Sequence, residues 1–147
     1  LIKERAHGAR GEEASASAKA TLALALSVQL RLFAPFLPFV TEEVWSWWQP
    51  GLIHSSQWPT VDELAAAGDG DAQVLLDAGI VLSQIRKAKS EAKVSMRTPV
   101  ATTTVEGPAL IVERVRLASG DLTAAGSVQE LTITATDSDQ LAVAVTL

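Results

Sequence analysis

Apolar residues along the first third of the chain follow a pattern that at first resembles a β-strand. From 22 to 32 a leucine or valine stands at every second position, which is the period of a strand. The run nevertheless continues from Ala14 through alanine-rich sequence without a turn signal, and about twenty residues exceed the length of an ordinary strand. We therefore predict one long helix that is apolar over most of its circumference, as in the centre of a helical bundle.

Two prolines interrupt this helix and create a bend that is rich in phenylalanine. Pro35 and Pro38 break regular helical hydrogen bonding, because proline lacks an amide hydrogen. Phe33, Phe36 and Phe39 are distributed through the bend. Their large apolar rings predict that they are mostly buried, so the bend should belong to the hydrophobic core.

Residues that favour helix starts predict three further helices. Thr41 is a suitable N-cap for a helix from about 41 to 48, and Thr60 opens a short helix with Glu63 in the capping-box position. Asp71 can cap a third long helix. The apolar residues of this helix recur at alternating spacings of four and three and form one packed seam: Val74, Ala78, Val81, Ile85, Ala88 and Ala92.

The composition changes after residue 97 towards threonine, valine and glycine. We place a domain boundary there, because 98–147 predicts a strand, a helix that begins near Pro108, and two further strands. The predicted fold class is α+β. A helical bundle over 1–97 is followed by a small α/β subdomain over 98–147, in which one helix covers a three-stranded sheet.

Composition excludes several kinds of functional site. The 147 residues are 48% hydrophobic and 20% charged, which is typical of a globular protein. The absence of cysteine excludes disulfides, cysteine-ligated metals and a cysteine nucleophile. The adjacent acids Glu42 and Glu43 point about 100° apart on a helix, so they cannot act as an acid and base pair on one bond. We predict no catalytic residue, no metal ligand set and no cofactor for this chain.

Charge is distributed unevenly along the chain. Its net charge is −5, yet five cations occur within twelve residues: Arg86, Lys87, Lys89, Lys93 and Arg97. On a continuous helix all of them except Lys87 would share an arc of about 80° and repel one another. A polyanion would relieve this repulsion, and a merely solvated helix face is the alternative. We take the five residues as candidate phosphate contacts.

The tryptophans suggest a second candidate contact. Trp47 and Trp48 are adjacent and point about 100° apart, so one helix cannot bury both equally well. The exposed ring would be part of a lid over the core, a docking contact for another domain, or a stacking platform for an unpaired base.

Arg31, within the most apolar stretch of the chain, argues against a membrane span.

Three sequence runs occur in an order typical of one enzyme family. LRLFAPFLPFVTEEVW at 30–45 resembles the anticodon-binding region of the class I aminoacyl-tRNA synthetases for branched aliphatic amino acids, in which an APFLPF-type bend leads into a TEE-x-W helix. IHSSQWP at 53–59 and IRKAKSEAKV at 85–94 are similar to the motifs that follow in that family. Among its members, the valyl-tRNA synthetases of actinobacterial type are the most similar, and the isoleucyl enzymes are the alternative.

The resemblance implies a C-terminal fragment of such an enzyme, with an anticodon-binding bundle truncated at its N-terminal side. The expected partners are a tRNA, valine-specific in the valyl case, and other domains of the same protein. ATP and Mg²⁺ would belong to the parent enzyme, a cytoplasmic valine–tRNA ligase, because this chain lacks the family's HIGH and KMSKS signatures. A purely structural docking module is the other interpretation.

Overall fold

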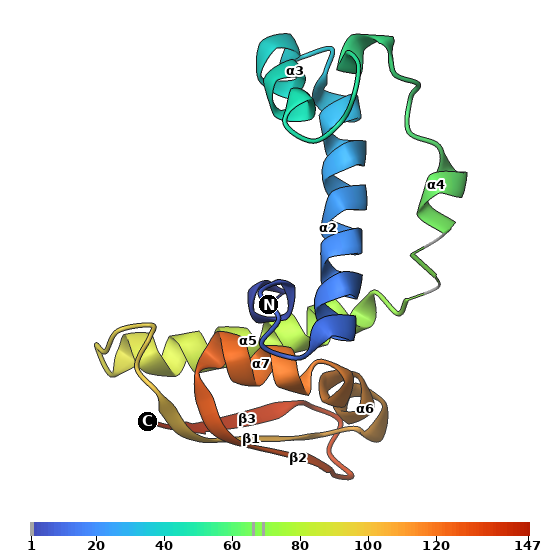
Figure 1. Ribbon diagram of the computed structural model, residues 1–147. Helices are drawn as coiled ribbons and strands as arrows, with labels where there is room; N and C mark the ends of the chain where they lie inside the picture. The colour runs from blue at the N-terminus through green and yellow to red at the C-terminus, as the bar shows by residue number, and fades with distance from the viewer. Residues whose placement is uncertain (1, 66, 69) are drawn as a thin grey trace. The chain divides into compact units, whose positions relative to one another are not determined.

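The computed structural model describes residues 2–65, 67–68 and 70–147 and divides the chain into two compact units (Figure 1). One unit comprises residues 8–70, and the other combines residues 71–147 with the N-terminal segment that ends at His7. Helices in both units and a three-stranded sheet in the second confirm the predicted α+β class. Within the described part of the chain, every helix is too short or too polar to span a bilayer.

Among the described residues of the 8–70 unit, the regular elements are all helices. The predicted long helix is α2, Glu12–Phe33, and it ends at the proline bend. The next helix, α3, spans Pro38–Ser46 and begins three residues before Thr41, because proline in a first turn loses no helical hydrogen bond. The hydroxyl of Thr41 donates to the Leu37 carbonyl at 2.8 Å instead of capping the helix. A 3₁₀ turn, η1 (Ile53–Ser55), and α4 (Val61–Ala65) complete the unit.

The core of this unit is small and excludes the phenylalanines of the bend. It consists of three buried side chains and a partly buried leucine: Ala34, Trp45, Ile53 and Leu30. Phe33, Phe36 and Phe39 are 53%, 78% and 90% exposed, so the prediction that they are mostly buried is wrong. The bend buries Ala34 in this core, and the described elements of the unit leave the three rings uncovered.

The second unit contains a mixed sheet. Its strands are β1 (Val100–Gly107), β2 (Val128–Ala135) and β3 (Ala142–Thr146), in the order β2-β1-β3. β1 pairs parallel with β2 and antiparallel with β3. α6 (Ala109–Leu117) and α7 (Ser119–Gly126) connect β1 to β2. A short N-terminal helix, α1 (Lys3–Ala6), is tied to α7 by an ion pair of 2.6 Å between Arg5 and Asp121.

Three helices, rather than the predicted one, cover the sheet. α5 (Gln73–Glu91), α6 and α7 lie on the same face of it (Figure 1). α7 was not predicted because its sequence, SGDLTAAG, contains two glycines and has weak helix propensity. Tertiary burial compensates for this weakness, since Asp121 and Leu122 of α7 are both buried.

The apolar seam of α5 forms the core of this second unit. The N-cap of α5 is Ala72 rather than the predicted Asp71, which stands one residue earlier and accepts a hydrogen bond of 2.9 Å from the Gln73 amide. Ala78, Val81 and Ile85 of the seam are buried together with side chains of β1, α6, α7 and β2. Because α5 packs with the sheet, the compact units divide between 70 and 71 rather than at the predicted boundary between 97 and 98.

Candidate nucleic-acid interface

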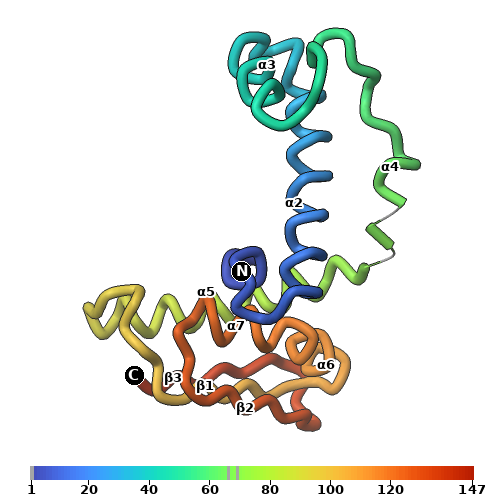
Figure 2. The backbone as a smooth tube through the Cα atoms, in the orientation of Figure 1, coloured from blue at the N-terminus to red at the C-terminus, as the bar shows by residue number. Residues whose placement is uncertain are grey.

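The predicted cationic stripe requires a helix that continues to residue 97, but α5 ends at Glu91. The Lys93 amide donates to the Ser90 carbonyl at 3.0 Å, and the Val94 amide donates to the Lys89 carbonyl at 3.1 Å. This pair of bonds is a Schellman ending, with Lys93 in the left-handed conformation at φ 55°. Lys93 and Arg97 therefore lie in the 92–98 loop rather than on a helix face. Figure 2 shows the loop that follows α5 and leads to β1.

Lys89 is not a surface residue, so its prediction as a phosphate contact is wrong. Only 1% of the residue is exposed. Its Nζ donates to the Met96 carbonyl at 3.0 Å and to the Gly126 carbonyl at 2.7 Å. Burial away from water lowers the pKa of this ammonium below its ordinary range. The side chain is directed into the unit because position 89 lies one turn beyond Ile85 on the buried side of α5.

Four exposed cations remain at the end of α5, and we call them the cationic end: Arg86, Lys87, Lys93 and Arg97. Lys87 lies 3.9 Å from the Glu91 carboxylate, one helical turn further on, and both side chains are largely exposed. Such an exposed pair is weak and leaves Lys87 available to a stronger anion. In the described part of the chain, no carboxylate pairs with Arg86, Lys93 or Arg97. With one carboxylate, Glu91, among four exposed cations, this segment of the chain carries excess positive charge, which suits a polyanion.

The adjacent tryptophans differ in exposure as expected, but both lie beyond the end of α3 at Ser46 rather than on the predicted helix. Trp47 is 69% exposed, and its Nε1 donates to a Glu43 carboxylate oxygen at 3.1 Å. Trp48 is half as exposed and stands against Trp45, with 6.0 Å between the ring centroids. Trp47 therefore offers a free aromatic face, whereas Trp48 belongs mainly to the packing around Trp45.

A cavity of about 270 Å³ beside the proline bend has no counterpart in the sequence-based candidates. Ile53 contributes to its apolar part, Trp58 lines it with a ring that is 61% exposed, and His54 lies beside them. His54 Nε2 is 3.2 Å from the Pro38 carbonyl, which fixes the imidazole. The Trp-Pro pair at 58–59 was the available sequence signal for this cavity.

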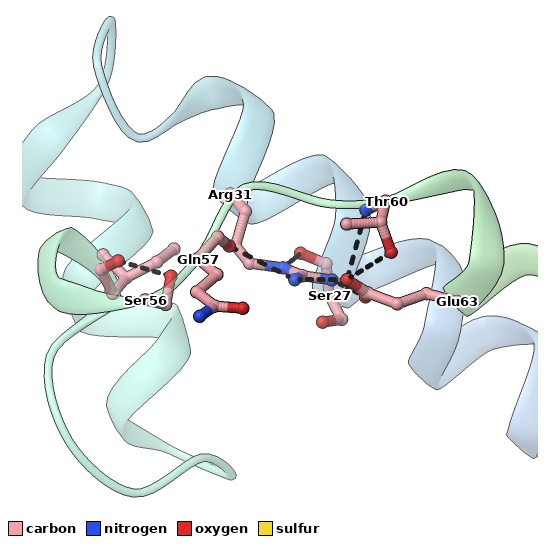
Figure 3. A network of polar contacts seen from close by, with 7 residues as sticks. Ser27, Arg31, Ser56, Gln57, Thr60 and Glu63 are labelled. Atoms are coloured by element: carbon pink, nitrogen blue, oxygen red, sulfur yellow. Dashed lines mark hydrogen bonds and ion pairs between the residues drawn. The ribbon is translucent and has the colours of Figure 1, made fainter.

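Arg31 lines the same cavity and is held in place by an ion pair. Its two terminal nitrogens each donate to a different oxygen of Glu63, and one also donates to the Gln57 carbonyl at 3.3 Å (Figure 3). The hydrogen bond from Arg31 lowers the pKa of Glu63, and the Thr60 amide, 3.2 Å from the same carboxylate, adds to the effect. The Thr60 amide contact is one of the two hydrogen bonds of the predicted capping box, whereas the Thr60 hydroxyl lies 3.5 Å from the Glu63 carboxylate. The sequence did not indicate the ion pair, because 32 residues separate its partners.

Other parts of the described chain offer no comparable chemistry. No group of three or more acidic or histidine side chains is placed to hold a metal ion among the described residues. Glu42, one of the adjacent acids, accepts the Ile53 amide at 3.1 Å and so has a structural contact. The outward face of the sheet carries threonine, alanine and glutamate, including Thr104 and Glu106, and lacks the aromatic residues on which RNA-binding sheets stack bases.

Comparison with known proteins places this arrangement in a family. Residues 1–105 match the family model described as the anticodon-binding domain of tRNA ligase. The chain is 53% identical to a valine–tRNA ligase of Thermobifida fusca over its whole length, 47% identical to that of Cutibacterium acnes over 90% of it, and 50% identical to that of Salinispora tropica over 89% of it. It spans 16%, 15% and 17% of the length of these three proteins.

Proposed function

The chain belongs to the family of anticodon-binding domains of tRNA ligases, and we propose that it binds the anticodon stem-loop of a valine tRNA as one part of a valine–tRNA ligase. The observation that carries the proposal is the agreement between the family match and the relatives, which are themselves valine–tRNA ligases. The same relatives favour valine over isoleucine as the amino acid of the parent enzyme.

The proposed binding combines backbone contacts with base contacts. The cationic end of α5 would contact phosphates, because each neutralised phosphate releases condensed counterions. Trp47 would stack on an unpaired base of the loop, since aromatic stacking tolerates any base. Neither contact performs chemistry. Aminoacylation, with ATP and Mg²⁺, would take place in other domains of the cytoplasmic ligase, and anticodon binding would position the acceptor end there.

A purely structural docking module is the competing function. In that case the cationic end would pack against an acidic surface of another domain rather than against RNA. The two functions differ in their response to the anticodon sequence. Only the RNA-binding function makes activity depend on the bases of the loop, because a docking surface does not contact them.

The proposal can be tested by transplanting the chain into an enzyme. The matching segment of the Thermobifida fusca valine–tRNA ligase is replaced by these 147 residues, and aminoacylation is measured with a valine tRNA and with a variant in which the anticodon is exchanged. We expect the chimera to charge the valine tRNA and to lose at least tenfold in kcat/KM with the exchanged anticodon, about 1.4 kcal/mol of discrimination. Equal charging of both tRNAs would favour the docking module. A valine-tRNA variant that is changed only in its variable loop, and keeps its anticodon, serves as the RNA control.

A further inference from the structure

We infer that Lys89 is a positioning residue for RNA binding, because its buried ammonium holds the 92–98 loop in the conformation that presents Lys93 and Arg97 at the surface. The inference rests on the proposed function and adds to it a residue that acts from inside the fold. Lys89 itself would not contact RNA.

Lys89 is bound to the loop at two points. Its backbone carbonyl accepts the Val94 amide at 3.1 Å, and its ammonium donates to the Met96 carbonyl at 3.0 Å. Each of these anchored residues is next to an exposed cation, since Lys93 precedes Val94 and Arg97 follows Met96. The two contacts therefore fix the backbone on which both cations are carried.

A third contact joins the loop to the rest of the unit. The Lys89 ammonium donates to the carbonyl of Gly126, the last residue of α7, at 2.7 Å. Carbonyls at a helix C-terminus carry partial negative charge and bind cations favourably. A side chain at 126 would force a neighbour to shift, because its Cβ would approach Val128 Cγ2 to 2.9 Å and Ile85 Cδ1 to 3.2 Å. The ammonium thus links α5, the 92–98 loop and the end of α7.

The free-energy cost of burying the Lys89 ammonium indicates that the role of its charge is to link α5, the 92–98 loop and the end of α7. Removing an ammonium from water is expensive, and position 89 lies beside the apolar seam of α5, where an aliphatic side chain would otherwise suit the core. The desolvation is offset by hydrogen bonds to two carbonyls, one of which lies in a loop that has no helix or strand of its own. What the ammonium adds beyond packing is a defined loop geometry.

The inference predicts a particular pattern of coupling between Lys89 and the loop cations. A fluorescein-labelled anticodon stem-loop of a valine tRNA is titrated with the 147-residue chain at several salt concentrations. Lys93→Ala/Arg97→Ala should weaken binding and lower the slope of log K against log salt by roughly 1.4 to 1.8, for two phosphate contacts. Lys89→Met removes no exposed charge, yet it should reproduce most of both changes. The triple variant should bind no more weakly than the double variant, because the lysine acts through the loop cations.

Other results would overturn the inference. If Lys89→Met leaves the slope at the wild-type value, or if its effect is fully additive in the triple variant, Lys89 does not act through Lys93 and Arg97. A double variant that binds like the wild type would also overturn it, because the loop cations would then make no contact. A different result would contradict the proposed function itself. In that case the wild-type chain would bind the stem-loop no more tightly than a hairpin of scrambled loop sequence.

Two further variants separate positioning from stability. Val115→Ala shortens another buried side chain of the same core and should lower stability while leaving the salt slope unchanged. Ser95→Ala removes the hydroxyl that accepts a hydrogen bond of 3.2 Å from the Arg97 amide. This exposed change loosens the same loop without disturbing the core. It should lower the slope in the same direction as Lys89→Met, and it decides the question if Lys89→Met does not fold. A wild-type slope in Ser95→Ala would overturn the inference in that case.

Discussion

Lys93 adopts a backbone conformation that usually requires glycine. Its φ of 55° places it at the left-handed position of the Schellman ending of α5, where a side chain costs about 1–2 kcal/mol because Cβ crowds the following carbonyl. The described part of the chain has a second such residue, Ser127, at the end of α7. A strained lysine that is exposed and unpaired suggests that its charge is useful at this place.

Replacing Lys93 by glycine should therefore separate stability from binding. Relief of the left-handed strain exceeds the roughly 0.4–1 kcal/mol by which glycine favours the unfolded chain, so Lys93→Gly should raise the free energy of unfolding by about 0.5–1 kcal/mol. Urea unfolding followed by circular dichroism measures this gain. RNA affinity should fall in the same variant.

Lys87→Gly is the matched control for charge and side-chain length. Lys87 is inside α5, where glycine should cost about 1 kcal/mol instead. If Lys93→Gly is also destabilised by that amount, the left-handed conformation carries no strain that glycine can relieve.

The ion pair between Arg31 and Glu63 joins α2 to the start of α4 within the 8–70 unit. Because the hydrogen bond from Arg31 lowers the pKa of Glu63 below its ordinary 4.5, the ionised carboxylate stabilises the folded state. Because the pKa of Glu63 is lower in the folded protein, the ion pair adds to stability only where the carboxylate is ionised. The contribution is fully present above the ordinary pKa and is lost as pH falls through the lower value in the folded protein.

Glu63→Gln should therefore remove a pH-dependent part of the stability of this unit. We expect the Tm of the wild type to exceed that of the variant near neutral pH, and the difference to shrink as pH falls below about 4.5. All four tryptophans of the sequence lie between 45 and 58, so their fluorescence follows the 8–70 unit alone. Asp62→Asn, an exposed neighbour in α4, is the control and should leave the pH dependence unchanged. A difference in Tm that is constant with pH would contradict the assigned ion pair.

The division of the chain at 70/71 has a direct consequence for folding. The core of the sheet unit includes Ala78, Val81, Leu82 and Ile85, which come from α5. Without α5, the apolar side chains that pack against these four residues would be exposed to water. A fragment that begins after α5 therefore lacks one whole wall of the apolar cluster.

Two fragments test this consequence. Residues 71–147 lack the N-terminal segment of this unit but keep its whole apolar core, so they should unfold cooperatively. Residues 98–147, the subdomain expected from composition, should lack a cooperative transition. Far-UV circular dichroism with thermal unfolding distinguishes the two. Cooperative folding of 98–147 would show that the α5 seam is dispensable and would restore the boundary at 97/98.

Local pattern was sufficient for several parts of the molecule. The absence of turn signals identified α2 in spite of its alternating leucines, and the spacing of Val81 and Ile85 identified the buried seam of α5. The family was recognisable from short runs such as the bend and the TEE-x-W helix, because these runs follow one another in the order that is typical of the family. Unequal exposure of the two adjacent tryptophans was also expected, and Trp47 is the more exposed, although both lie beyond the end of α3 at Ser46. These features depend on residues that are close together in the sequence.

Tertiary packing decided the features that depend on distant residues. Helical spacing relates the cations of α5 to one another, but it does not show that the helix ends at Glu91 or that Gly126, 37 residues away, supplies a carbonyl to Lys89. The exposure of Phe39 has the same origin, because an apolar ring is buried only where another element covers it. Arg31 and Glu63 likewise meet across 32 residues. The chemistry of a side chain is set by its type, whereas its access to solvent or to a partner is set by the segments that fold against it.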